Sequence, residues 1–171
     1  MTMSEQTRGG AKPLTAATIM SCHPNVLHPY DTIHLAAEVV MKYRYRNLPV
    51  VDDESIFQGC FGIGSLLRMV LPHAAVMQNG LDHLQFLSDD LSQMNSRFCQ
   101  HQQRPVSDFM ERKVKTVSPD NPLIDTMLIV YREKSSLPVV EPHSGKLVGM
   151  ISYWDIGQSI MAVRHGGAGG E

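Results

Sequence analysis

Residues 137–156 read LPVVEPHSGKLVGMISYWDI and carry the strongest structural signal in the chain. An apolar, β-branched run at 137–140 is followed by a turn at 141–145 and a second strand-like run at 146–151. Two such runs joined by a turn that contains proline and glycine predict a β-hairpin. Ser152, with Asp155 three residues later, is typical of a helix start. The stretch therefore predicts a hairpin that leads directly into a helix.

The same pattern occurs once earlier in the chain. LPVV recurs at residues 48–51, and it is again followed by a turn, a glycine-containing strand and a short apolar helix. Gly59 lies 90 positions before Gly149, and Met20 lies 90 positions before Met110. A fixed spacing of this kind indicates an internal repeat, here a duplicated unit of roughly 55 residues.

The ordered pieces of this repeat resemble the CBS domain (the cystathionine-β-synthase-type domain), present as a tandem pair called a Bateman module. The resemblance covers residues 15–71 and 106–161. It implies an α/β (α+β) fold in which two βαββα units pack about a pseudo-two-fold axis. We expect five segments: a disordered tail at 1–13, a first unit at 14–72, a helical linker at 73–104, a second unit at 105–164 and a disordered glycine-rich tail at 165–171.

Two amphipathic stripes are predicted. Apolar residues recur at spacings of three and four through residues 81–98, which indicates a helix of about five turns between the units. Two interpretations of this helix stay open, because it either covers its own module or docks a partner or a second copy. In the second unit, the stripe of Ile124, Met127, Leu128 and Tyr131 predicts the buried face of a helix.

Composition narrows the class of protein. The chain has 171 residues, 43% of them hydrophobic, and a net charge of −2, so a nucleic-acid partner is not expected. Its three cysteines are scattered, which favours a reducing compartment and a cytoplasmic protein. The first 12 residues lack the apolar centre of a signal peptide. The most apolar window, residues 60–77, contains Arg68 and Pro72, so no membrane insertion is expected.

The resemblance implies one good ligand cleft, in the second unit, for an adenosine-containing ligand such as AMP, ADP, ATP or S-adenosylmethionine. It implies Asp155 on the ribose, where one carboxylate accepts hydrogen bonds from both vicinal hydroxyls, and Ser152 near the phosphate. It places the base between two groups of residues, which are Val114, Lys115 and Thr116 on one side and Ser135, Ser136 and Leu137 on the other.

The resemblance also implies a weaker cleft in the first unit. Ser65 stands at the position of Asp155 and Gly62 at that of Ser152, so ribose recognition is expected to weaken there. The other residues of this cleft are Val26, Arg46 and Asn47. A competing interpretation needs no ligand, because Ser152 and Asp155 also fit a capping box that stabilises the start of a helix. The first unit lacks this pair, an asymmetry that mildly favours a ligand role.

We expect no catalytic residues, no resident metal and no required cofactor. The chain has eight histidines but no Cys-x-x-Cys or His-x-x-x-His spacing, and it contains none of the common nucleophile or phosphate-loop motifs. The expected function is a non-enzymatic regulatory module that senses a nucleotide, forms a homodimer and acts on a protein target in trans. The alternative is a ligand-independent interaction protein that docks its partner through the helix at 81–98.

Overall fold

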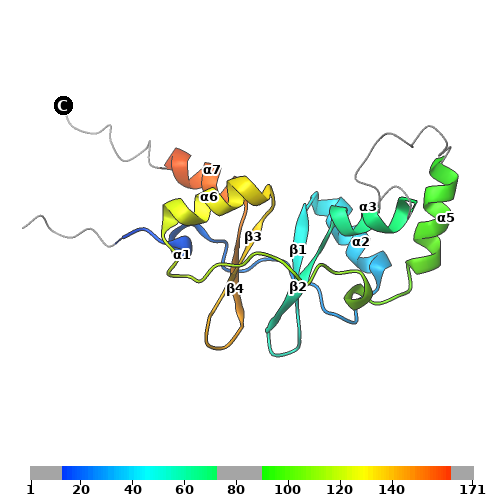
Figure 1. Cartoon of the computed structure of the whole chain (residues 1–171), viewed down its shortest axis with the longest axis horizontal. Coiled ribbons are helices and arrows are strands. Elements are labelled where there is room, and N and C mark those ends of the chain that lie inside the picture. The colour runs from blue at the N-terminus through cyan, green and yellow to red at the C-terminus, as the bar shows by residue number, and fades with distance from the viewer. Residues whose placement is uncertain (1–12, 73–89, 163–171) are drawn as a thin grey trace, which may run out of the picture.

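The computed structural model describes residues 13–72 and 90–162. Two similar α/β units lie side by side, each with a β-hairpin on one side and two helices on the other (Figure 1). The two hairpin tips point the same way and touch, since Phe57 N donates to Gly145 O at 3.0 Å and Leu147 N donates to Ser55 O at 3.0 Å. The α/β class and the tandem pair of units predicted from the sequence are confirmed.

The first unit contains helix α2 (Ile33–Tyr43), strands β1 (Asn47–Val51) and β2 (Phe57–Gly62), and helix α3 (Ile63–Val70). The strands pair antiparallel from Asn47 opposite Gly62 to Val51 opposite Phe57. Leu27 adds a short parallel bridge to Val50. The alternating apolar residues of the hairpin and the apolar face of α2 form one core, in which Ile33 and Phe61 are fully buried.

The second unit repeats this order with helix α6 (Leu123–Glu133), strands β3 (Leu137–Val140) and β4 (Leu147–Ile151), and helix α7 (Tyr153–Ala162). Its strands pair from Leu137 opposite Ile151 to Val140 opposite Leu147, with a parallel bridge from Val117 to Val139. Each unit therefore builds a separate core.

The segments that lead into the two units are exchanged between them. Helix α1 (Ala16–Ile19) precedes the first unit in sequence, yet Ala16 and Ile19 belong to the core of the second. The chain after α1 then crosses β4, where Ser21 N donates to Met150 O at 2.9 Å and Met150 N donates to Ser21 O at 3.0 Å. The first half of the chain thus completes the second unit.

The reciprocal exchange completes the first unit. The 3-10 turn η2 (Val106–Asp108) places Val106 and Met110 in the core of the first unit. The next residues cross β2, where Cys60 N donates to Glu111 O at 2.9 Å and Glu111 N donates to Cys60 O at 2.7 Å. Each core therefore depends on residues from both halves of the chain.

The glycines that repeat at a spacing of 90 lie where these crossings occur. A Cβ atom on Gly59 would lie 2.5 Å from Glu111 O, and one on Gly149 would lie 2.9 Å from Ser21 O. Gly59 also has a φ of 155°, a backbone conformation that residues with a side chain rarely adopt. The repeated glycines permit the close approach of the exchanged segments.

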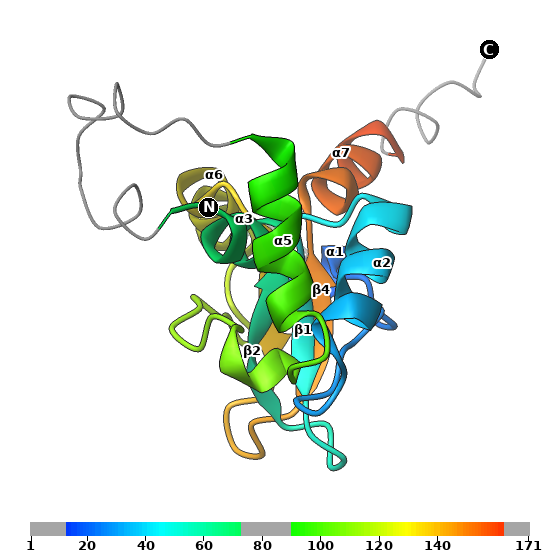
Figure 2. The same ribbon diagram turned by 90° about the vertical axis from the view of Figure 1, so that its right-hand side faces the viewer.

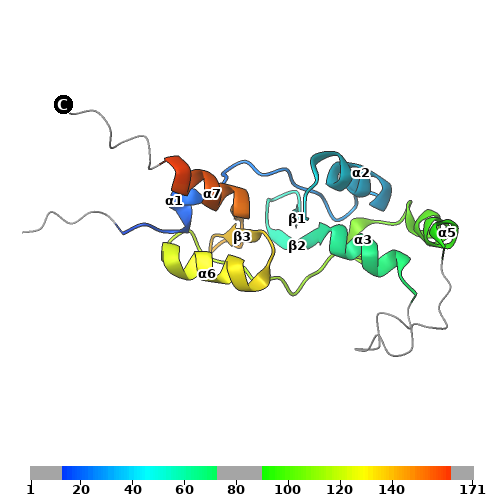
Figure 3. The same ribbon diagram turned by 90° about the horizontal axis from the view of Figure 1, so that it is seen from above.

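The segment between the units forms helix α5 (Leu91–His101), which lies along α3 at the outer edge of the first unit (Figures 2 and 3). Asp90 caps its start, accepting a hydrogen bond from Gln93 N at 2.8 Å. Phe98 packs against the first core, which is the covering role foreseen for this stripe, whereas Leu91 is 83% exposed. The first half of the predicted stripe, with Leu81, Leu84 and Leu87, lies outside the described residues.

The predicted buried face of the helix at 123–133 is wrong. Ile124, Leu128 and Tyr131 are 73%, 43% and 72% exposed, whereas Thr126 and Val130 face the core. Thr126 is tolerated there because its hydroxyl donates to Pro122 O at 2.9 Å and accepts from Asn121 Nδ2 at 2.8 Å. The apolar periodicity predicted the wrong face of this helix, because a polar residue faces the core and the apolar stripe faces outward. Among the helices of residues 13–72 and 90–162, none is long and apolar enough to cross a bilayer.

Candidate functional site

Two clefts lie between the units, related by the pseudo-two-fold axis of the repeat. We call them the aspartate cleft, which contains Asp155, and the lysine cleft, which contains Lys115. Arg46, Asn47 and Ser136 line both. Asn47 Nδ2 donates to Ser136 O at 3.2 Å, which joins the units at this boundary, while Asn47 Oδ1 is buried without a hydrogen-bond partner among the described residues.

The aspartate cleft has a volume of about 450 Å³. Ser152 and Asp155 approach it from the start of α7, and the exchanged segment after α1 forms the opposite wall. The rest of the lining comes from the end of α2 and the start of β1. Its residues are Ser21, His23, Pro24, Asn25, Tyr43, Arg44, Tyr45, Arg46, Asn47, Leu48, Pro49, Ser136, Met150, Tyr153 and Trp154.

Ser152 and Asp155 form a capping box within this cleft. Asp155 Oδ2 accepts hydrogen bonds from Ser152 N at 2.7 Å and from Ser152 Oγ at 2.5 Å. Asp155 N in turn donates to Ser152 Oγ at 3.3 Å. The structure thus bears out the capping interpretation, yet it leaves Asp155 Oδ1 without a hydrogen bond from the described residues. A half-buried carboxylate with one free oxygen is therefore presented to the cleft.

Aromatic side chains and cations surround this carboxylate. Tyr45 accepts a hydrogen bond on its hydroxyl from Asn25 Nδ2 at 2.6 Å, which ties the exchanged segment to the end of α2. Trp154 is 79% exposed at the mouth of the cleft. Arg44 and Arg46 supply positive charge. The cleft thus combines flat apolar surfaces, a carboxylate and two guanidinium groups, a set suited to a ring, a diol and a phosphate.

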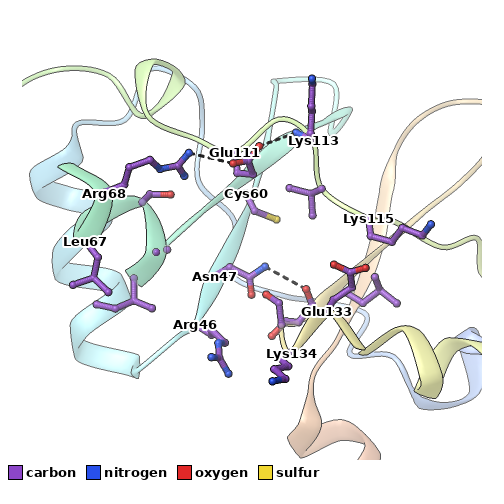
Figure 4. Close-up of a pocket in the computed structure, with 18 residues that line it drawn as sticks. Arg46, Asn47, Cys60, Leu67, Arg68, Glu111, Lys113, Lys115, Glu133 and Lys134 are labelled. Carbon is purple, nitrogen blue, oxygen red and sulfur yellow. Dashed lines mark hydrogen bonds and ion pairs between the residues drawn. The ribbon is translucent and has the colours of Figure 1, made fainter. Parts of the chain in front are cut away.

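The lysine cleft has a volume of about 500 Å³ and lies between α3 and the end of α6 (Figure 4). Gly62 and Ser65 stand where the aspartate cleft has Ser152 and Asp155. Five cationic side chains line it against two carboxylates. These residues are Arg46, Arg68, Lys113, Lys115 and Lys134, with Glu111 and Glu133.

The set predicted for a single cleft in the second unit is divided between the two clefts. Val114, Lys115, Ser135 and Leu137 line the lysine cleft, away from Ser152 and Asp155. Ser136 lines both clefts, whereas Thr116 and Val26 line neither. The exchange of leading segments is the physical cause, since it brings residues 111–115 to the first unit and residues 21–25 to the second.

Sequence reasoning missed the residues that face Asp155 in the structure, notably His23, Asn25 and Tyr45. The repeat contained a signal for two of them. His23 and Asn25 lie 90 positions before Lys113 and Lys115, so both pairs occupy equivalent places in the repeat. The sequence repeat does not indicate which of the two units each leading segment joins.

The asymmetry between Ser152 and Gly62 has a packing cause. In the first hairpin the ladder extends to a pair between Asn47 and Gly62, whereas the second hairpin ends at Leu137 and Ile151. A Cβ atom on Gly62 would lie 2.1 Å from Arg46 O, so no capping serine fits there. The absence of a capping box in the first unit therefore no longer favours a ligand role for the second.

One buried thiol, that of Cys60, faces the lysine cleft. Burial raises the pKa of the Cys60 thiol, which faces the lysine cleft, to about 12, so the reactive thiolate is scarce at neutral pH. Within residues 13–72 and 90–162, no group of three histidine, cysteine, aspartate or glutamate side chains is arranged to hold a metal ion.

Comparison with solved structures supports the same fold. CBSX2 from Arabidopsis thaliana, a CBS-pair protein, is 18% identical and aligns over 90% of this chain and 98% of its own, with a TM-score of 0.70. CBSX2 in complex with AMP is 19% identical, with coverage of 88% and 98% and a TM-score of 0.64. The CBS domain pair of protein MJ0100, in complex with 5′-methylthioadenosine and S-adenosyl-L-methionine, is 17% identical, with coverage of 89% and 99% and a TM-score of 0.58.

A search among curated proteins finds no match. The sequence profile of the CBS domain, however, matches residues 16–71 and 106–161, which together make up more than half of the chain. These two ranges agree with the two structural units, and each begins at the leading segment that is exchanged. The chain therefore belongs to the CBS-domain family, as a tandem CBS pair.

Proposed function

We propose that this CBS pair is a non-enzymatic regulatory module of the cytoplasm that binds an adenosine-containing nucleotide in the aspartate cleft and acts on a protein target in trans. AMP, ADP, ATP and S-adenosylmethionine are the candidate ligands. The complexes of structurally similar CBS pairs with AMP and with S-adenosyl-L-methionine support this choice. Regulation follows if the ligand binds one arrangement of the module more tightly than another.

The observation that carries the proposal is the free oxygen of Asp155 in a cleft with aromatic walls. Asp155 Oδ1 is available to one ribose hydroxyl, and Oδ2 is available to the other if the bond from Ser152 Oγ is given up. Tyr45 and Trp154 offer surfaces for the base, and Arg44 lies in the same cleft for a phosphate. In this proposal the ligand lies against His23 and the residues after it, which line the same cleft as Asp155, rather than against residues 114–116.

Replacement of Asp155 by alanine is expected to abolish most nucleotide binding while the protein stays folded. Hydrogen bonds to a charged group are worth about 1.5–3 kcal/mol, so affinity should fall roughly ten- to a hundredfold. Loss of the cap should cost only about 1 kcal/mol in the ligand-free protein. Thermal melting with and without each nucleotide separates the two effects, because a ligand at a hundredfold excess over Kd adds about 2.7 kcal/mol.

Asp125→Ala is the matched control for this variant. Asp125, like Asp155, is an acid in the first turn of its helix, but it is exposed and lines neither cleft. The control should keep the full nucleotide-induced rise in melting temperature. If Asp155→Ala keeps the same rise as the control, or if the wild-type protein shows none with any of the four ligands, the proposed function is wrong.

We also propose that the module forms a homodimer through the outer face of α6 and α7. Ile124 and Tyr131 on α6 and Ile160 and Met161 on α7 are large apolar residues that are each at least 60% exposed, and exposed apolar surface of this kind marks interaction sites. Sedimentation velocity should show a dimer for the wild-type chain and a monomer for Ile124→Ser combined with Tyr131→Ser. Leu91→Ser removes an equally exposed apolar side chain on α5 and should leave the dimer intact. A monomeric wild-type chain would contradict this assembly.

A further inference from the structure

We infer that the lysine cleft is a separate site for an oligophosphate, which it recognises through phosphate charge and without regard to a nucleoside. This inference is independent of nucleotide binding in the aspartate cleft. It rests on the charge of the lysine cleft, on the open start of α3 and on the lack of a carboxylate at that helix start.

The charge of the cleft is strongly positive once internal pairing is counted. Arg68 Nη1 contacts Glu111 Oε2 at 3.2 Å, so one cation and one carboxylate neutralise each other. Four cations then remain against Glu133, and none of the four forms an ion pair among the described residues; they are Arg46, Lys113, Lys115 and Lys134. A concave surface lined by one sign of charge focuses the field and attracts ions of opposite charge.

Three lysine side chains lie at the rim of the lysine cleft. Lys113, Lys115 and Lys134 stand around the rim with their ammonium groups extended away from the centre (Figure 4). All three side chains are exposed and flexible, so they are free to turn inward once an anion neutralises them.

The start of α3 adds uncapped backbone donors to the same cleft. Its first residue, Ile63, donates its N–H to Arg46 O at 3.1 Å, but the N-cap Gly62 provides no side-chain hydrogen bond. Gly64 lines the cleft and has no atom within 4 Å of the place of its missing Cβ, so the backbone there is open to a ligand. Free N–H groups at a helix start, together with the helix dipole, favour an anion.

The aspartate cleft differs from the lysine cleft at the corresponding helix start. There the start of α7 is occupied by its own acid, Asp155, which accepts from Ser152 N and would repel a phosphate at that point. In the lysine cleft the equivalent residue is Ser65, which is 6% exposed and carries no charge. The lysine cleft thus has no carboxylate at the helix start, and its one unpaired carboxylate, Glu133, belongs to the end of α6, among the cationic residues. The lysine cleft is therefore expected to distinguish ligands by the number of their negative charges.

The test is a calorimetric titration of the full chain with tripolyphosphate, pyrophosphate and orthophosphate at low ionic strength. We expect affinity to rise with the number of phosphates and to fall at least tenfold when Lys113, Lys115 and Lys134 are all changed to glutamine. A matched triple variant changes Lys42, Arg132 and Lys146 to glutamine. It removes the same charge from exposed residues that line neither cleft, and it should bind as the wild type does.

Two further arms identify the source of the phosphates and separate this inference from the proposed function. In the Asp155→Ala protein, tripolyphosphate, ATP and GTP should bind within about threefold of one another, since only the phosphate chain is read. In the Asp155→Ala protein, changing the three lysines to glutamine should still lower tripolyphosphate affinity at least tenfold, even if AMP binding is lost. Absence of tripolyphosphate binding, an equal loss in the two triple variants, or binding of ATP without binding of tripolyphosphate would each overturn the inference.

Discussion

Gly59→Ala is expected to destabilise the protein by about 3 kcal/mol, although it adds a single methyl group. Overpacking in a tight site costs roughly 1–3 kcal/mol, and a side chain at a disfavoured backbone conformation costs of order 1–3 kcal/mol more. At Gly59 both penalties apply, because the new Cβ atom would lie 2.5 Å from Glu111 O and φ is 155°. Glu111 O is backbone and is hydrogen-bonded to Cys60 N, so it cannot move away without breaking the crossing.

Gly157→Ala, the same change of residue at another position, is expected to stabilise the protein. Gly157 lies within α7 and has no atom within 4 Å of the place of its missing Cβ. Alanine is favoured over glycine inside a helix by about 0.5–1 kcal/mol, so this variant should be stabilised. Chemical denaturation of both variants checks the pair. A Gly59→Ala protein as stable as wild type would mean that the exchanged segment does not cross β2 as closely as described.

Phe61→Ala is expected to cost about 3–5 kcal/mol, because it empties the centre of the first core. The Phe61 side chain is fully buried and packs in a cluster that includes Val106 and Met110 from the leading segment of the second unit. At roughly 2–4 °C per kcal/mol for a chain of this size, the melting temperature should fall by about 10 °C. Met41→Ala, a change at an exposed residue of the same unit, should stay within about 0.5 kcal/mol of wild type.

The number of thermal unfolding transitions tests whether the two units are coupled. Since α1 from the first half belongs to the second core and η2 from the second half belongs to the first, neither core is complete without the other. Phe61→Ala should therefore lower a single cooperative transition, and the amides of Val130 and Val139 in the second unit should lose protection from hydrogen exchange to the same degree. Two resolved transitions, with the second unit unaffected, would contradict this coupling.

The sequence was informative where the physics is local. The hairpins, the turns that close them and the helix that follows each of them depend on residues a few positions apart, and all were predictable. The apolar stripe of Ile124 and Tyr131 was placed on the wrong face, because periodicity shows that a helix has two faces but not which one meets the core. In this helix a satisfied threonine, Thr126, is the residue that turns inward.

The division of the candidate site was beyond the sequence for a different reason. The leading segments have equivalent positions in a duplicated chain, so residues 21–25 and 111–115 fit either unit equally well in a pattern. Only the ladder bonds from Ser21 to Met150 and from Cys60 to Glu111 decide the matter. The capping role of Asp155 was foreseen as one of two alternatives, and the geometry shows that a cap and a free carboxylate oxygen coexist.

The exchange of leading segments also has a consequence for synthesis of the chain. Residues 13–72 leave the ribosome first, yet their core lacks Val106 and Met110 until the chain has grown through η2, and helix α1 must wait longer still for the strands of the second unit. Domains generally fold as they emerge, but the first unit is expected to close only after the chain has been translated through Met110. During that interval, the apolar faces of the first hairpin stay available to chaperones, and a pause before Met110 would prolong that exposure.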